Sequence, residues 1–151
     1  MTTATMETAH ASAVRTDQCD IMEHARQLCE NVILTMVLDA NPQYMAILDE
    51  NRQIVAANSS IANTFTTGRI NEILGTRPGE LLGCQHASTS PGGCGTTEAC
   101  RNCGAVKSIL SAQNGKPATN DCQITNGESF ESLDLNVSAS PVQIDGRALT
   151  F

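Results

Sequence analysis

The sequence predicts one domain of the α+β class, with a five-stranded antiparallel sheet and short helices on one face. Three observations predict it. The chain has 151 residues, the size of one domain. Apolar residues make up 40 % of the chain, enough for a hydrophobic core. Strand patterns occur near both ends, with helical patterns between them, and this order is typical of helices inserted into an antiparallel sheet.

The composition excludes several classes of function. The chain has 9 Lys and Arg against 16 Asp and Glu, a net charge of −7 that is unsuited to a nucleic-acid backbone. Aromatic residues are only 3 %, too few for a stacking platform. No apolar run of about 18 residues predicts a membrane span, and the start lacks a secretory pattern. We therefore expect a cytoplasmic protein that binds neither nucleic acid nor membrane.

The amino-terminal region is predicted to have two parts. Residues 1–18 are rich in Thr, Ala and Ser without periodicity, which predicts a disordered tail. Residues 19–40 are predicted to form a flanking amphipathic helix, because apolar residues recur at spacings of three and four. Asp20 is the candidate cap, and the helix ends before Pro42. The main domain is then expected over residues 41–151.

The main domain is predicted to begin with a β-hairpin. Apolar runs at residues 44–48 and 54–57 flank a polar turn, the pattern of two antiparallel strands. Short helices are expected at residues 61–66, capped by Asn58 or its neighbour, and at residues 70–82.

The second half is predicted to supply one longer helix and three more strands. The helix is expected at residues 105–112, ended by the Asn-Gly and Pro that follow. Residues 129–138 alternate apolar and polar side chains, which indicates a half-buried strand. A weaker strand pattern precedes it at residues 119–124, and an apolar run at residues 148–151 gives the last strand.

Two segments resemble a known family. Residues 47–49 read Ile-Leu-Asp and residues 53–58 read Gln-Ile-Val-Ala-Ala-Asn, like the first hairpin of PAS domains. Residues 75–81, Gly-Thr-Arg-Pro-Gly-Glu-Leu, look like the middle-helix segment of that family. The resemblance covers roughly residues 41–151 and implies the PAS fold.

The resemblance also implies a function and partners. PAS domains are sensory modules of bacterial signalling proteins, so we expect a sensor without enzymatic activity of its own, joined to a carboxy-terminal effector of histidine kinase or cyclic-dinucleotide type. The chain departs from the family at Arg52, where the family often has Gly. The family's last strand also extends several residues beyond the position of Phe151, so that strand is expected to be truncated here.

A cluster of cysteines is the main chemical signal. The chain has 7 Cys without an export signal, which favours ligands or redox groups over structural disulfides. Four fall in the spacing C-x9-C-x5-C-x2-C: Cys84, Cys94, Cys100 and Cys103. Residues 83–104 contain almost no apolar side chains, so a metal centre is a natural organiser, because its binding free energy becomes folding free energy.

Four thiolates suit an iron–sulfur cluster, [2Fe–2S] or [4Fe–4S], or a zinc ion. The spacing of Cys94, Cys100 and Cys103 resembles the loop of vertebrate-type [2Fe–2S] ferredoxins, with Cys84 as an upstream fourth ligand. PAS domains with an iron–sulfur cluster are known in oxygen-sensing histidine kinases, although with different spacing. We predict an iron–sulfur cluster; structural zinc is the alternative, and free thiols or a disulfide switch are the third reading.

The remaining candidates are weaker. His86 and Cys122 are possible substitutes for one ligand, whereas Cys19 and Cys29 are not expected to take part. No phosphate-binding loop or hydrolase motif is present, which favours sensing over catalysis. The predicted function is redox or oxygen sensing, relayed to the effector through the helix at residues 105–112 and the sheet. The alternatives are a PAS dimerisation module with structural zinc and, last, a small-ligand or flavin sensor.

The flanking helix predicts a homodimer. Besides its main apolar stripe, a second apolar surface is formed by Ile33, Leu34, Val37 and Leu38. One sheet face cannot cover both surfaces, and an exposed apolar patch of this kind marks an interface. We therefore expect a symmetric dimer with this helix at the interface.

Overall fold

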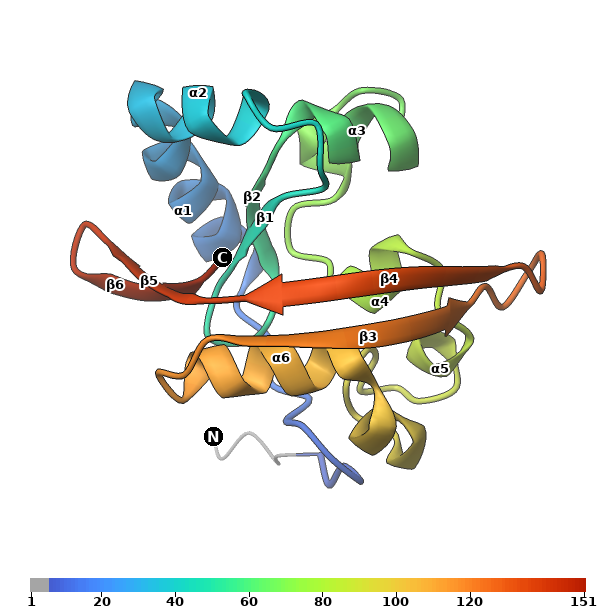
Figure 1. The fold of residues 1–151 in the computed structure, drawn as a ribbon. Helices are drawn as coiled ribbons and strands as arrows, with labels where there is room; N and C mark the ends of the chain where they lie inside the picture. Colours follow the sequence, from blue (N-terminus) through green and yellow to red (C-terminus); the bar gives the residue numbers. More distant parts are fainter. Residues whose placement is uncertain (1–5) are drawn as a thin grey trace.

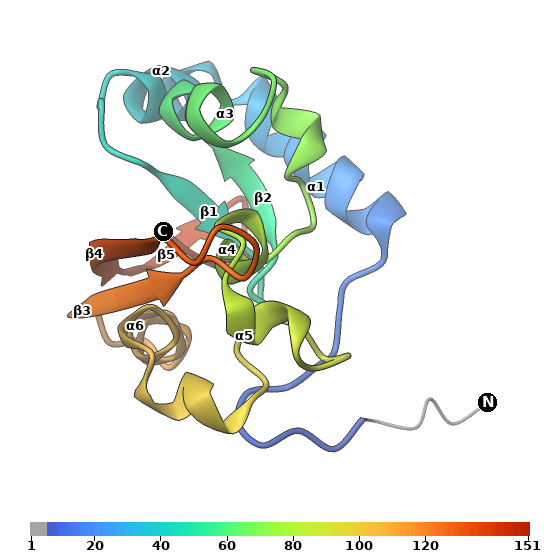
Figure 2. The ribbon, with the colours of Figure 1, turned by 90° about the vertical axis from the view of Figure 1, so that its right-hand side faces the viewer.

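The computed structural model describes residues 6–151. Antiparallel strands form its centre, with α6 along β3 and β4 and the helices α1 to α3 at the β1–β2 end (Figures 1 and 2). The helices are α1 (Gln18–Glu30), α2 (Val32–Asp39), α3 (Ser59–Phe65), η1 (Ile70–Glu72), α4 (Pro78–Leu81), α5 (Gln85–Ser88), η2 (Glu98–Asn102) and α6 (Gly104–Gln113). The strands are β1 (Ala46–Leu48), β2 (Ile54–Ala57), β3 (Ala118–Thr125), β4 (Ser132–Ala139), β5 (Pro141–Ile144) and β6 (Arg147–Thr150).

The strands form two connected ladders. One has the order β2-β1-β6-β5, and β3 pairs with β4 in the other, all antiparallel. Only Ser140 separates β4 from β5, and it exchanges two backbone hydrogen bonds with Phe151, of 2.8 and 2.9 Å. With β4 and β5 taken as one strand bent at Ser140, the five antiparallel strands of the sequence prediction are confirmed. Among the described strands β4 pairs with β3 alone.

The predicted hairpin is confirmed as β1 and β2. The Asp49 carboxylate accepts hydrogen bonds from the backbone N–H groups of Asn51 (2.9 Å) and Gln53 (2.8 Å), which bends the chain back on itself. Arg52 has a φ of 65°, the left-handed region in which glycine is least strained. Arg52 is the residue at which the chain departs from the family, which often has Gly there, and a glycine would adopt this φ without strain.

The hydrophobic core covers both faces of this hairpin. Ile47, Leu48, Ile54 and Val55 are each at most 4 % exposed. Since neighbouring residues of a strand point to opposite faces, apolar groups must cover both. Helix α1 packs against β2, with Ile21 fully buried, and α6 packs against β3, β4 and β6.

The predicted flanking helix is two helices rather than one. Asn31 has extended backbone angles, and its side chain accepts a 3.1 Å hydrogen bond from the N–H of Leu34, so it caps α2. Helix α1 begins one residue earlier than predicted, with Asp17 rather than Asp20 as its cap. The break lets α1 pack on β2 while α2 packs on α3. Of the predicted second apolar surface, Leu38 is buried and Leu34 packs against the core, so only Ile33 and Val37 are exposed as expected. Together with these two, α2 exposes two further large apolar side chains, each of the four at least 59 % exposed: Val32, Ile33, Met36 and Val37.

Residues 6–17, which we call the N-terminal segment, belong to the region expected to be a disordered tail. The N–H groups of Ala9 and Ala11 each donate a 3.0 Å hydrogen bond, to the carbonyl oxygens of Thr96 and Gly95. The segment is thus held by backbone hydrogen bonds rather than by an apolar stripe, which explains why periodicity gives no signal for it. The first five residues of the predicted tail lie outside the described residues.

No helix within residues 6–151 combines the length and the hydrophobicity that a membrane crossing needs.

Candidate cysteine site

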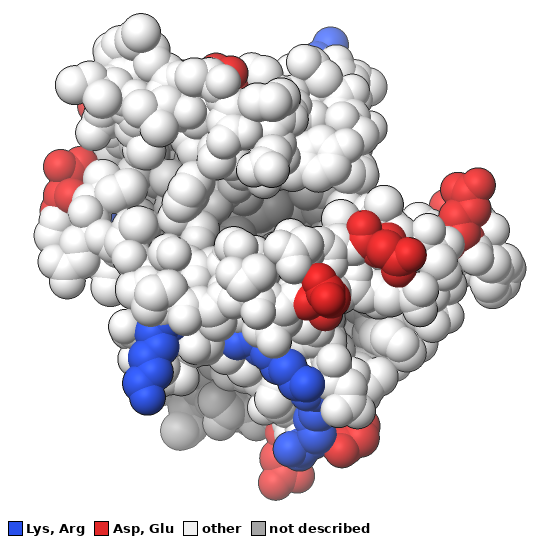
Figure 3. All heavy atoms as spheres, viewed as in Figure 1, with Lys and Arg blue, Asp and Glu red and all other residues white. Residues whose placement is uncertain are grey.

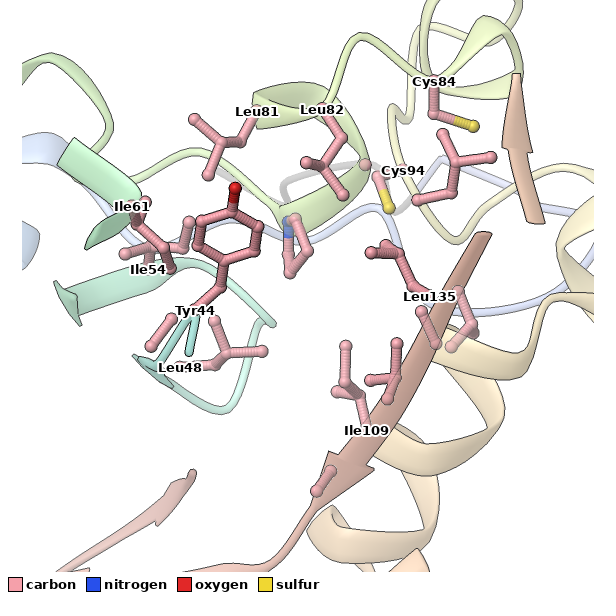
Figure 4. Close-up of a pocket in the computed structure, with 18 of the residues that line it drawn as sticks. Tyr44, Leu48, Ile54, Ile61, Leu81, Leu82, Cys84, Cys94, Ile109 and Leu135 are labelled. Atoms are coloured by element: carbon pink, nitrogen blue, oxygen red, sulfur yellow. The ribbon is translucent and has the colours of Figure 1, made fainter. Parts of the chain in front are cut away.

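A cavity of about 1080 Å³ lies between the β1–α3 end of the molecule and the strands and helix β3, β4 and α6. Figure 3 shows a hollow above β4 whose rim consists of uncharged residues. Figure 4 shows apolar side chains facing the cavity from several elements: Tyr44, Leu48, Ile54, Ile61, Leu81, Leu82, Ile109 and Leu135. Tyr44 packs edge-on against Phe65, with ring centroids 5.1 Å apart. The cavity is therefore largely apolar.

The four predicted ligand cysteines all line this cavity. Cys84 precedes α5, Cys94 lies in the loop before η2, Cys100 lies within η2, and Cys103 is the N-cap of α6. Figure 4 shows the Cys94 sulfur pointing into the cavity. All seven cysteines are free thiols.

Other potential ligands lie nearby or elsewhere. His86, a predicted substitute ligand, also lines the cavity. Cys19 and Cys29 are exposed on α1. Within residues 6–151, no three or more Cys, His, Asp or Glu side chains converge closely enough around one point to hold a metal ion. The four thiols thus border a common space rather than a single point.

Gly79 of α4 allows the chain to pass close to two of these cysteines. A Cβ atom at Gly79 would lie 2.7 Å from Sγ of Cys94 and 3.4 Å from Cβ of Cys84. Burial raises the pKa of the Cys94 thiol to about 12, although the Gly79 N–H donates to the sulfur and opposes this shift. At neutral pH the thiol is therefore protonated, and a metal must displace that proton to bind.

A fully buried arginine holds the loop that carries Cys94. Arg77 donates to the carbonyl oxygens of Gly92 (2.8 Å) and Cys94 (3.3 Å). It also donates to Asn51 O at 3.0 Å and Val14 O at 2.7 Å, so one guanidinium connects the hairpin turn, the N-terminal segment and the cysteine loop. Burial lowers its pKa to about 10, and it stays charged at neutral pH.

A second buried arginine lies next to the cysteine loop. Arg52 is 4 % exposed and donates to Ser12 O at 2.7 Å, whereas its Nε is buried and has no hydrogen-bond partner within the described part of the chain. A Cβ atom at Gly95 would lie 3.2 Å from this Nε. Burial lowers the pKa of Arg52, and the electrostatic effect of Cys94 opposes that shift. A negative charge on Cys94 would therefore be stabilised by Arg52.

One carboxylate connects α4 to the loop. Glu80 pairs with Arg15 and accepts hydrogen bonds from the N–H groups of Arg77 (3.0 Å) and Cys94 (3.2 Å). Burial alone would raise the pKa of Glu80, but the hydrogen bond from Arg15 and those from the backbone lower it below its usual value. Glu80 is therefore ionised at neutral pH and fixes the backbone of Cys94.

A fifth cysteine lies beside the predicted set. Cys122 of β3 is 5 % exposed, and its Sγ lies 3.6 Å from Sγ of Cys103. Burial raises its pKa to about 11. Cys100 instead has its sulfur 3.1 Å from the Thr97 hydroxyl.

The sequence predicts Cys122 only as a substitute ligand, and it does not predict Arg52 or Arg77 as residues of the site. Arg77, between Gly75 and Gly79, gave a weak signal of such a role, whereas nothing in the polar turn around Arg52 pointed to its role.

No protein-family profile matches the chain, and no curated protein matches it in sequence. Several solved structures resemble it, and two of them are described here. The PAS domain of nitrogen regulation protein NR(II) from Vibrio parahaemolyticus has a TM-score of 0.50 and 20 % identity, over 77 % of this chain and 90 % of that one. The PAS domain of Bordetella pertussis BvgS has a TM-score of 0.52 and 14 % identity, over 81 % of each chain. The chain has the PAS fold that its sequence predicts.

Proposed function

We propose that this chain is a sensor module of a signalling protein, in which Cys84, Cys94, Cys100 and Cys103 bind an iron–sulfur cluster that responds to redox state or oxygen. The observation that carries the proposal is that four thiols from four separate local structures line one cavity. The resemblance to the PAS domain of a nitrogen regulation protein supports a role in regulation, without catalysis in this module.

The surroundings of the cysteines suit a negatively charged centre. The four sulfurs border one cavity but do not converge on one point within residues 6–151, so the cysteine loop would have to close around a cluster for all four to bind it. Three guanidinium groups, of Arg15, Arg52 and Arg77, are electrostatically coupled to one another there, with Glu80 as a carboxylate among them. Arg52 and Arg77 favour a thiolate at Cys94, whereas burial and the Glu80 carboxylate raise the pKa of that thiol. When bound, an iron–sulfur cluster supplies one-electron redox chemistry and sensitivity to oxidants.

The protein's own residues would convert a change at the site into a change of conformation. Cys94 must give up its proton before it can act as a ligand, and Arg52 and Arg77 stabilise the resulting charge. Cys103 is the N-cap of α6, and α6 packs on β3 and β4. Rearrangement of the cysteine loop therefore reaches the sheet through α6, and from there the proposed carboxy-terminal effector, a histidine kinase or a cyclic-dinucleotide enzyme.

The proposed working unit is a homodimer formed through the flanking helices. Helix α2 exposes Val32, Ile33, Met36 and Val37 on one short element, an apolar surface that a second copy of the chain would cover. A dimer interface at this position adjoins α1, which packs on the core. A small rotation there would provide the second state that a sensor needs.

Anaerobic purification followed by metal and labile-sulfide analysis tests the proposed centre. We expect iron and sulfide in the wild-type chain, with most of both lost on Cys→Ser substitution at position 84, 94, 100 or 103. The matched controls Cys19→Ser and Cys29→Ser change exposed thiols of α1 and should keep the metal.

Other outcomes contradict the cluster. One zinc per chain without sulfide would support the alternative, a dimerisation module with a structural zinc site. A yellow protein without metal would support a flavin sensor. A colourless chain without metal or cofactor would overturn the proposed function.

A further inference from the structure

Two cysteine sulfurs are brought together by a close approach of two backbones. Gly104 follows Cys103 at the start of α6, and Asp121 precedes Cys122 in β3. A Cβ atom at Gly104 would collide with the carbonyl oxygen of Asp121, so only glycine allows the helix start to lie this close to the strand. The neighbouring cysteines consequently face each other, with their Sγ atoms 3.6 Å apart.

The two thiols have different surroundings. Cys103 borders the cavity and is partly exposed, whereas Cys122 is 5 % exposed. Cys103 is therefore the thiol that a reagent in the cavity would reach first.

We propose that Cys103 and Cys122 form a reversible dithiol–disulfide couple, oxidised by a low-molecular-weight disulfide such as glutathione disulfide. The thiolate of Cys103 attacks one sulfur of the small disulfide, and the sulfur–sulfur bond breaks to release the first small thiol. The Cys122 sulfur then attacks Cys103 in the mixed disulfide and releases the second. Together the two protein thiols lose two electrons and two protons, and the small disulfide takes them up to become two small thiols.

Little movement is needed to form the bond. The sulfurs must approach by about 1.5 Å, from their present separation to a bonded distance of about 2.05 Å. Cys103 lies at the junction of η2 and α6, where its side chain can adjust without moving a strand. Cys100 is the cysteine nearest to Cys103 in the sequence and could also form a disulfide with it, but its sulfur lies beside the Thr97 hydroxyl.

The couple goes beyond the proposed function and does not require a metal centre. Oxidation would remove Cys103 from the proposed ligand set and would tie the start of α6 to β3. A centre bound through Cys103 would in turn protect the pair from oxidation. Metal binding through Cys103 and formation of the Cys103–Cys122 disulfide would therefore exclude each other, because both use the Cys103 sulfur.

The experiment is disulfide mapping of the chain in glutathione buffers of graded oxidised-to-reduced ratio, as purified and after removal of metal by a chelator. Free thiols are trapped by alkylation, and the peptides are identified by mass spectrometry. In the metal-free chain we expect residues 103 and 122 to become protected together, as one cross-linked peptide pair, and to be released again by reduced glutathione.

Variants identify the partners. Cys122→Ala should abolish the cross-link and leave Cys103 as a mixed disulfide with glutathione, whereas Cys100→Ala should keep the cross-link. Circular dichroism checks that both variants fold, and mapping of the wild-type chain decides the question if one does not. A cross-link between Cys100 and Cys103, or full alkylation of both thiols in the most oxidising buffer, would overturn the proposal. Metal content, measured separately, reports on the proposed centre, so the two hypotheses can fail independently.

Discussion

Nη1 of Arg77 donates a 2.8 Å hydrogen bond to the carbonyl oxygen of Gly92, and the arginine side chain has no exposed surface. A charged group is costly to bury unless its hydrogen bonds are satisfied. Here backbone carbonyl groups of three separate segments satisfy it, including Asn51 in the hairpin turn and Val14 in the N-terminal segment. The cysteine loop, which has almost no apolar side chains, is therefore ordered partly by one cation.

Arg77→Met should destabilise the chain, since methionine fills part of the volume but donates no hydrogen bonds. Several buried carbonyl groups would lose their partner, and we expect the free energy of unfolding to fall by about 3 kcal/mol. Urea denaturation measures this fall. Arg69→Met, at an exposed arginine, is the matched control and should change little. Equal stability of the two variants would contradict the role assigned to Arg77.

Gly79→Ala should disturb the proposed metal site more than the fold. The backbone of Gly79 is helical and accepts alanine, but the added Cβ would lie 2.7 Å from Sγ of Cys94. We expect reduced metal content and a loss of about 1–3 kcal/mol in the free energy of unfolding. The double variant Gly79→Ala/Cys94→Ala removes the collision. If that double variant is as unstable as the sum of the two single changes, the collision with the sulfur is not the cause.

The stability of the metal-free chain should fall in alkaline solution. Burial raises the pKa of Cys94 from an ordinary 9.0 to about 12, so between these values the unfolded thiol ionises while the folded thiol stays protonated. The unfolded state then binds fewer protons, and stability declines by about 1.4 kcal/mol per pH unit for this thiol. Denaturation at a series of pH values measures the slope. Cys94→Ser should lower the slope, and an unchanged slope would show that this thiol is not responsible.

Charges on α2 should dissociate the proposed dimer. Ile33 and Val37 are 76 % and 59 % exposed, and glutamate at both positions would place two carboxylates in each half of the interface. Sedimentation velocity should change from dimer to monomer. Phe130→Glu, at an equally exposed apolar residue of the β3–β4 turn, should leave the dimer intact. A wild-type chain that stays monomeric at high micromolar concentration would contradict the dimer itself.

The elements whose conformation is set by neighbouring residues in the sequence could be predicted. Asn58 illustrates this, because its side chain accepts from the N–H of Ile61 and caps α3 as its position in the sequence predicts. The Asp49 turn and the alternating strand β4 are of the same kind. In each case the residues that determine the conformation lie within a few positions of one another.

The features that were missed depend on contacts between distant segments. The apolar pattern continues across Asn31 and hides the cap that this residue supplies, and the break there lets α1 pack on β2 and α2 pack on α3. Cys122 lies 19 positions from Cys103, and the approach of Gly104 to Asp121 that brings the sulfurs together leaves no periodic pattern. The four cysteines are grouped in the sequence, so the cavity that they share was easier to anticipate than the fifth thiol beside it.

The pairing of the N-terminal segment with the cysteine loop has a mechanical consequence. Ala9 and Ala11 are tied to Thr96 and Gly95, and α1 begins only a few residues later at Gln18. The segment is therefore a short tether between the loop and the flanking helices, with a second attachment where Arg15 pairs with Glu80. Between these attachments and α1, Thr16 also binds Asp49 and Gln53 of the hairpin, so a displacement of the loop would act on the start of α1 and on the hairpin turn together, and a force applied to α1 would act on the cysteine loop in return.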